Sequence, residues 1–267
     1  MRKFGFTLFV SMLLAGTSFC QTADVPAFDS TDFAVKSKLA EWLVKYNEVA
    51  LITADSLRSL NSAKLSQIGK EWFCFQDSNR AWHAIYGRFI KGAYNVLFHF
   101  IVNSSNAAFL SRSKLDSSMV TSYARALYTA GRIIKPLQDT LKMSMVRFIR
   151  QNEDKTITVW VFPGLQPEGY AIYGGEFVYN FTSDGKKVIG NSSYFSGKFS
   201  AVQVDRPQVI TLDYGELQQP TIGSLFFVWN YKPYFNRINI QNAHYTITAI
   251  NGGGAYFWAH FRRKQAK

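Results

Sequence analysis

The chain is poor in cysteine, and its two cysteines do not suffice for a disulfide framework. Of 267 residues only Cys20 and Cys74 are cysteines. Because we expect a leader to be removed at Cys20, one thiol remains and no internal disulfide forms. Cys74 has aromatic neighbours, which is typical of a buried structural cysteine and not of a reactive thiol. An exported chain of this size without disulfides indicates a bacterial periplasm.

Histidine is also scarce, and the sequence carries no motif that identifies a chemistry. No histidine lies within five residues of another histidine or a cysteine, so the spacings typical of zinc sites are absent. The serine-hydrolase pattern Gly-x-Ser-x-Gly does not occur. The run Gly252-Gly253-Gly254 lacks the helix or Lys-Ser/Thr pair that follows a phosphate-binding loop. We therefore expect no bound metal and no cofactor.

The first twenty residues have the order of a secretory signal peptide. Residues 1–3 form a basic head, residues 4–15 an apolar run, and the next five a small-residue exit without charge. We predict cleavage after Cys20, with Ser18 as the alternative. A lipid anchor at Cys20 is disfavoured because bulky Phe19 precedes it. The run is shorter than the about 20 residues that span a bilayer. We expect an exported protein, periplasmic or extracellular, with no transmembrane segment after cleavage.

Acidic residues are outnumbered by basic ones. Against 30 lysines and arginines there are 18 aspartates and glutamates, which gives a net charge of +12. This charge favours anionic neighbours such as membrane headgroups or acidic polysaccharide, while export argues against nucleic acid as a partner. Hydrophobic residues make up 47% of the chain, a fraction that excludes a largely disordered protein.

Two stretches of the N-terminal half have helical periodicity. In the first, Asp29 or Ser30 caps a helix that runs to about Leu60. In the second, Asp116 begins a helix that Pro136 is expected to kink or split, because proline lacks the amide donor. The apolar residues at helical spacing are Val35, Leu39, Trp42, Leu43, Tyr46, Val49 and Ala50, and Met119, Tyr123, Ala126, Leu127, Ala130, Ile133, Ile134, Leu137 and Leu141.

The remaining sequence is rich in aromatic and β-branched residues with strand periodicity. Alternating apolar residues over 94–102 indicate a strand, and Lys91-Gly92 before it predicts a hairpin turn. From Thr156 onward the chain has almost entirely strand character. The predicted strands of this half are Thr156–Phe162, Tyr170–Phe181, Lys187–Phe195, Phe199–Val204, Val209–Asp213, Ser224–Tyr231, Ile238–Ile250 and Ala255–Phe261.

Helices and strands are segregated along the chain, which predicts the α+β class. We expect two or three helices from the N-terminal half to pack on a largely antiparallel sheet, with a meander-like C-terminal half. Residues 21–267 are expected to form a single domain, and a split near residues 151–155 is the alternative.

His83 and His99 lie on the two arms of the predicted hairpin. A three-residue connection places the two imidazoles directly opposite each other, whereas a two-residue turn places them on opposite faces, because one residue of slip reverses the face. Glu71 and Asp77 are close to this pair in sequence. Histidines beside a carboxylate are suited to acid–base catalysis, so His83, His99 and Glu71 are candidate catalytic residues. The alternative is two histidines that only form hydrogen bonds within the sheet.

Glu176 is a further candidate catalytic residue, as the carboxylate of a glycosidase-type site. Such a site needs two carboxylates across a cleft, and the chain has only 18 acidic residues. The alternative is a solvated glutamate at a strand edge. The other acidic residues available in the second half are Glu153, Glu168, Asp184, Asp213 and Glu216.

Aromatic residues are abundant, with 23 Phe, 14 Tyr and 6 Trp. The predicted strand over 224–231 is apolar on both faces, so it is either covered on both sides or exposes a binding surface. Exposed rings beside cations stack sugars or dock on a partner. The candidate ligand-binding residues are Trp229, Tyr231, Lys232, Tyr234 and Arg237.

Together these features predict an exported, non-catalytic bacterial protein. Its expected ligand is an envelope component, a polysaccharide or a protein partner, bound through an aromatic and basic sheet surface. The alternative is a periplasmic hydrolase whose site is assembled from dispersed histidine and carboxylate residues.

Overall fold

The computed structural model describes residues 27–60, 62–205, 208–252 and 255–263. The predicted signal peptide and its cleavage residue Cys20 lie outside the described residues. The described part contains four α-helices and fourteen strands. The strands form three four-stranded sheets and one two-stranded sheet, in which antiparallel pairs predominate. This mixture of helices and mainly antiparallel sheets confirms the predicted α+β class.

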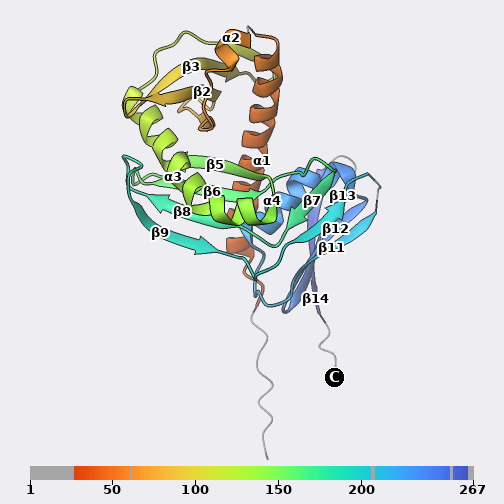
Figure 1. Ribbon diagram of the computed structural model, residues 1–267. Helices are drawn as coiled ribbons and strands as arrows, with labels where there is room; N and C mark the ends of the chain where they lie inside the picture. The colour runs from red at the N-terminus through yellow and green to blue at the C-terminus, as the bar shows by residue number, and fades with distance from the viewer. Residues whose placement is uncertain (1–26, 61, 206–207, 253–254, 264–267) are drawn as a thin grey trace, which may run out of the picture.

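Helix α1 (Ser30–Arg58) contacts all three larger sheets. Its N-cap is Asp29, whose carboxylate accepts hydrogen bonds from the N–H groups of Thr31 and Asp32. The predicted first helix is therefore confirmed: it begins after the predicted cap, and it ends at Arg58, two residues before the predicted end at Leu60. In Figure 1, α1 runs in red and orange from the lower part of the molecule to the sheet at the top.

The first sheet is antiparallel and packs on the C-terminal half of α1. Its strands lie in the order β1 (Phe73–Gln76), β2 (Trp82–Ile90), β3 (Ala93–Val102) and β4 (Ala108–Leu110), and the short helix α2 (Ser62–Leu65) precedes them. The β2–β3 turn is Lys91-Gly92, and both residues have positive φ, at 49° and 83°. This is the conformation that two-residue hairpin turns favour, and it confirms the predicted hairpin.

The second sheet is packed against helix α3. Its strands lie in the order β5 (Met145–Gln151), β6 (Ile157–Pro163), β8 (Phe177–Phe181) and β9 (Val188–Ser193), and β7 (Tyr170–Tyr173) pairs with β10 (Ser200–Gln203) beside it. β6 is buried along its whole length, and β5 is a strand that the sequence did not predict. Residues 151–155, the alternative domain boundary, belong to the β5–β6 turn and the end of β5. The single domain stays a prediction.

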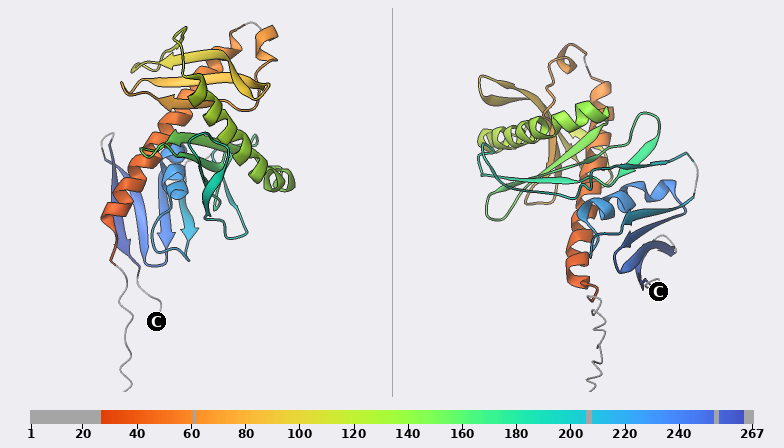
Figure 2. Two further views of the ribbon diagram at one scale, coloured as in Figure 1. Left: turned by 90° about the vertical axis from the view of Figure 1, so that its left-hand side faces the viewer. Right: turned by 60° about the horizontal axis from the view of Figure 1, so that its bottom comes forward.

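Helix α3 (Ser117–Leu141) passes through Pro136 without being split. Pro136 is exposed and lies in the last two turns of the helix, where a missing amide donor leaves a carbonyl that water can solvate. The helix begins at the predicted cap, Asp116. The turned views in Figure 2 show α3, in green, lying between the first and second sheets.

The third sheet contains a parallel pair that the sequence did not predict. Its order is β11 (Val209–Tyr214), β12 (Arg237–Asn242), β13 (Tyr245–Gly252) and β14 (Ala255–Arg262), and β11 runs parallel to β12. Parallel neighbours need a crossover connection. This connection is helix α4 (Ile222–Tyr231), followed by the 3₁₀ turn η1 (Lys232–Tyr234).

The predicted strand Ser224–Tyr231 is therefore wrong. Its nearly continuous apolar run fits a buried helix as well as a strand, because periodicity does not distinguish the two. The local signal for a helix is a capping box. The Thr221 side chain accepts from the N–H of Ser224, and the Ser224 hydroxyl accepts from the N–H of Thr221.

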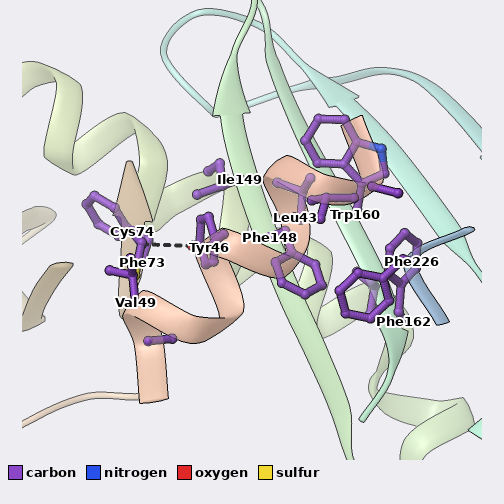
Figure 3. Packing of buried hydrophobic residues seen from close by; sticks show 14 of the residues in the cluster. Leu43, Tyr46, Val49, Phe73, Cys74, Phe148, Ile149, Trp160, Phe162 and Phe226 are labelled. Atoms are coloured by element: carbon purple, nitrogen blue, oxygen red, sulfur yellow. Dashed lines mark hydrogen bonds between the residues drawn. The ribbon is translucent and has the colours of Figure 1, made fainter. Parts of the chain in front are cut away.

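Tyr46 of α1 lies at the centre of the core and is fully buried. Its hydroxyl accepts a hydrogen bond of 2.8 Å from the N–H of Cys74 in β1, and its ring lies edge-on against Phe148 of β5. Figure 3 shows this bond and the neighbouring rings, including Phe162 and Phe226. Tyr46 thus joins α1 to two sheets. The Cys74 thiol is buried, as expected of a structural cysteine.

The substitution Tyr46→Phe is expected to lower the free energy of unfolding by about 1–3 kcal/mol, because it leaves the buried N–H of Cys74 without its acceptor. Chemical denaturation measures this loss. Tyr170→Phe is the control, since Tyr170 is exposed. Equal stability of the Tyr46→Phe variant and the unmodified protein would contradict this account of the core.

Candidate functional site

Asp77, His83 and His99 form a hydrogen-bonded chain across the first sheet, which we call the Asp77–His83–His99 chain. His83 Nδ1 lies 2.8 Å from His99 Nε2, and His83 Nε2 lies 3.2 Å from Asp77 Oδ2. Both histidines are buried, and the ring of Phe75 stacks on His83 with centroids 4.6 Å apart. The histidine pair that the sequence raised as a candidate is thus in direct contact.

The two histidines meet although the hairpin turn has only two residues. A β-bulge between Tyr86 and Gly87 shifts the register, so that Tyr86 pairs with Phe98 but Gly87 pairs with Val96. The extra residue returns His99 to the face that carries His83. Gly87 is the sequence signal for this bulge. A Cβ atom there would lie 2.1 Å from the Asn95 carbonyl oxygen, so only glycine fits.

The electrostatics of the chain favour an ionised aspartate and a neutral His99. Partial burial acts to raise the pKa of Asp77, but the Ala81 N–H and the His83 ring outweigh it and hold this pKa below its usual value. Burial and then the nearby His83 ring lower the pKa of His99, while the Ser113 backbone acts in the opposite direction.

Glu71 does not join this chain. It lies two residues before the start of β1, whereas the β1 residue opposite His83 is Phe75. Its carboxylate interacts electrostatically with Arg147 of β5 instead. The acidic partner of the histidines is Asp77, which the sequence placed near the pair but which we did not select as a site residue.

Glu176 is buried against the N-terminus of α4. It is 3% exposed, and its Oε2 accepts a hydrogen bond from the N–H of Gly223. Its Oε1 has no hydrogen-bond partner of standard geometry within the described ranges, although the Thr221 hydroxyl is close enough to favour the ionised form. Burial raises the pKa of Glu176 to about 7 against the effects of Thr221, Gly223 and Lys36.

The space beside Glu176 is too small for a substrate. The cavity that it lines has a volume of about 10 Å³, which is about the volume that a single water molecule needs. Glu176 is not a solvated strand-edge residue, and no sugar ring fits next to its carboxyl. Its raised pKa reflects structural burial.

A groove of about 730 Å³ lies between α1 and the segment formed by α4 and η1, and it is here called the α1–α4 groove. It brings together most of the predicted ligand-binding residues. Trp229, Tyr231, Lys232 and Tyr234 line it. Arg237 does not, because it begins β12 and pairs with Val209. The groove is lined by α1, by α4 and η1, and by residues at the start of β5 and the end of β6, so the predicted aromatic residues lie on a helix and a turn and not on a strand.

Charges in the α1–α4 groove are balanced within the protein. Lys45 Nζ forms an ion pair of 3.0 Å with Glu48, and Lys232 Nζ lies 4.1 Å from the centroid of the Trp229 ring. Burial lowers the pKa of Lys232, and the charges of Glu41 and Glu48 act against this. The Asn47 and Asn230 side chains, which also line the groove, form a hydrogen bond of 3.1 Å with each other.

Within the described residues, no three His, Cys, Asp or Glu side chains are grouped so as to hold a metal ion. No helix in this part of the chain is long and apolar enough to span a membrane. Comparisons of the chain with protein-family models, curated proteins and solved structures found no match. The chemistry of the sites themselves must therefore indicate the function.

Glu176→Gln is expected to stabilise the protein at pH 8 and to leave its stability nearly unchanged at pH 4. The folded pKa of about 7 exceeds the ordinary 4.5, so the folded protein keeps a proton that the unfolded chain releases, and stability is lost as pH rises between these values. The glutamine variant escapes this loss, which amounts to about 3 kcal/mol.

Urea denaturation at the two pH values measures this difference. Glu168→Gln is the matched control because Glu168 is exposed on the β6–β7 loop, and its stability is expected to follow that of the unmodified protein. If the Glu176→Gln variant were less stable than the unmodified protein at pH 8, the claim that burial of the Glu176 carboxylate destabilises the folded protein at this pH would be contradicted.

Proposed function

We propose that this protein is an exported, non-catalytic binding protein that holds a segment of neutral polysaccharide in the α1–α4 groove. The observation that carries the proposal is the groove itself, at about 730 Å³. This volume falls in the range of about 300–1,000 Å³ typical of ligand sites. The signal-peptide pattern of residues 1–20 supports export.

The lining of the α1–α4 groove suits a ligand with apolar ring faces and hydroxyl groups. Tyr234 is 44% exposed and Leu165 45%, and the half-buried Trp229 ring lies beside them. Aromatic faces pack on the C–H faces of sugar rings. The carboxylates and main-chain carbonyls around them accept hydrogen bonds from hydroxyl groups, and the amide side chains both accept and donate them.

The charge pattern favours a neutral sugar over an anionic one. The two lysines that line the α1–α4 groove, Lys45 and Lys232, are each near a glutamate of α1. Since these glutamates compensate the charge of the lysines, an anionic ligand would gain little electrostatic energy from binding in the groove. The high positive charge of the whole chain is thus not concentrated in this groove.

The hydrolase alternative draws on the Asp77–His83–His99 chain, but among the described residues no hydroxyl nucleophile contacts either imidazole. The hydroxyls of Ser111 and Ser113, on the segment between β4 and α3, form a hydrogen bond of 2.7 Å with each other. In the described part of the chain no serine hydroxyl is hydrogen-bonded to either imidazole. Nucleophilic catalysis requires that contact, so the binding function is better supported.

Tyr234→Ala is expected to weaken binding of a neutral oligosaccharide about tenfold, the effect of losing one aromatic stacking contact of about 1.4 kcal/mol. Titration calorimetry with maltotetraose, cellotetraose and chitotetraose tests this. The control is Tyr128→Ala, which removes a tyrosine of similar exposure, 46%, from α3.

Two results would overturn the proposal. One is absence of binding to all three sugars; the other is equal affinity of the Tyr234→Ala variant and the unmodified protein. Chromatography of the sugars after prolonged incubation separates binding from hydrolysis, since a binding protein returns them uncut.

A further inference from the structure

Strand β14 forms one edge of the third sheet and is exposed there. Among the described residues it has a single partner strand, β13. Phe257 is 61% exposed and Phe261 54%, and the side chains of His260 and Arg262 are exposed as well. An edge strand presents a row of unpaired N–H and C=O groups, with which a strand of another chain can pair.

We propose that β14 is a homodimer interface, in which two copies of this chain pair their β14 strands antiparallel about a two-fold axis at Ala259. The third sheets of the two copies then join into one continuous sheet. The interface lies apart from the α1–α4 groove, whose lining contains no residue of β14. The proposal is therefore independent of polysaccharide binding.

β14 lacks the features that keep edge strands from pairing. Natural edges are short, or they carry charges, prolines or bulges. The outer strands β1 and β4 have four and three residues, β11 carries Asp213, and the pairing of β9 with β8 is irregular at Asn180. β14 has eight residues, of which Arg262, the last, is charged. Burial lowers the pKa of His260, which is therefore neutral at pH 7.

The exposed phenylalanines share one face of the sheet. Alternate side chains of a strand lie on opposite faces. Phe33 of α1 packs on Trp258 and His260, with ring centroids 5.2 and 4.8 Å away, so these two side chains lie on the face toward α1. Residues 257, 259 and 261 therefore lie on the outer face, where the small Ala259 separates two exposed rings.

The free backbone groups of β14 belong to its even-numbered residues. Alternate residues of an antiparallel strand direct both their N–H and their C=O to the same neighbour. The Arg263 N–H donates to the His244 carbonyl, which lies just before β13, so the odd-numbered residues face β13. Residues 256, 258, 260 and 262 face the free edge. In a dimer, even-numbered residues must therefore pair with even-numbered ones, and odd with odd.

Of the two-fold registers that this rule allows, one pairs both phenylalanines. With Ala259 opposite itself, Phe257 of each copy lies opposite Phe261 of the other. These are non-hydrogen-bonded pairs, in which the Cα atoms are about 4.5 Å apart and the side chains are close. Cross-strand aromatic pairs stabilise a sheet. A register shifted to either side places Phe257 opposite Ala259 or Arg263 and loses both pairs.

The charge on β14 also favours an antiparallel second copy. In the proposed register each Arg262 lies opposite residue 256, so the two guanidinium groups are separated by six residues, or about 20 Å. This exceeds the Debye length of about 8 Å at physiological ionic strength. A parallel pair would place the same two charges side by side, at about 5 Å.

The size of the interface predicts a weak dimer. β14 contributes eight residues from each copy, whereas a standard interface has about 20–30 residues a side. We therefore expect a dimer that dissociates in the micromolar range and exchanges with the monomer.

Sedimentation velocity across the micromolar range tests the dimer, and the unmodified protein is expected to change reversibly from monomer to dimer. Ala259→Lys is expected to weaken dimerisation about tenfold or more, because two ammonium groups would meet at the axis. The matched control is Val209→Lys, which adds the same charge to β11, the opposite edge of the same sheet, at a residue that is 57% exposed. It is expected to dimerise like the unmodified protein.

Ala259→Cys tests the register. The two-fold axis places the new thiols opposite each other, with Cα atoms about 4.5 Å apart, within the range of about 4.4–6.8 Å found in disulfides. Oxidised glutathione, which is reduced as the disulfide forms, is expected to convert this variant into a covalent dimer. Val209→Cys is the control and is expected to remain monomeric. Both variants also carry Cys20→Ser, so that the other thiol is the buried Cys74.

The proposal fails on any of three results. A monomer at every concentration denies the dimer. Equal dimerisation of Ala259→Lys and Val209→Lys removes β14 from the contact, and equal cross-linking of the two cysteine variants reduces it to random collision. Should Ala259→Lys not fold, as judged by circular dichroism, the cysteine variants decide.

Discussion

The structure depends on how the apolar side of α1 is covered. No one sheet covers it: Phe33 packs on Trp258 of β14, Trp42 on Trp82 of β2, and Tyr46 on Phe148 of β5. A helix that buries aromatic residues against several partners fixes their relative positions, since packed interiors tolerate little displacement. The α1–α4 groove and the Asp77–His83–His99 chain therefore lie on elements held by the same helix.

Burial also explains which polar groups carry chemistry. Glu176 and His99 are both nearly inaccessible. Burial raises the pKa of the Glu176 carboxyl and lowers the pKa of the His99 imidazole, so it favours the neutral form of each. They differ in what surrounds them. Glu176 adjoins space for no more than one water molecule, whereas the His99 ring borders a hollow of about 340 Å³.

The sequence was sufficient for α1, α3 and the β2–β3 hairpin because their caps and turn are local. Asp29, Asp116 and Lys91-Gly92 act within a few residues. It was insufficient for α4, whose apolar run fits either state, and for the parallel β11–β12 pair that follows from it. Four of the five predicted ligand-binding residues line the α1–α4 groove, because α4 and η1 place them there. The acidic partner of the histidines, Asp77, lies on the loop between β1 and β2, and the spacing of residues in the sequence does not specify the geometry of that loop.

The bulge at Gly87 makes the histidine chain sensitive to chain length as well as to residue identity. A homologue could retain both imidazoles and the aspartate and still lack the chain, if a single residue were deleted from β3 next to Leu97, because the rings would then point to opposite sides of the sheet. In comparing relatives, a gap-free alignment of residues 87–99 is therefore as informative as the conservation of His83 and His99.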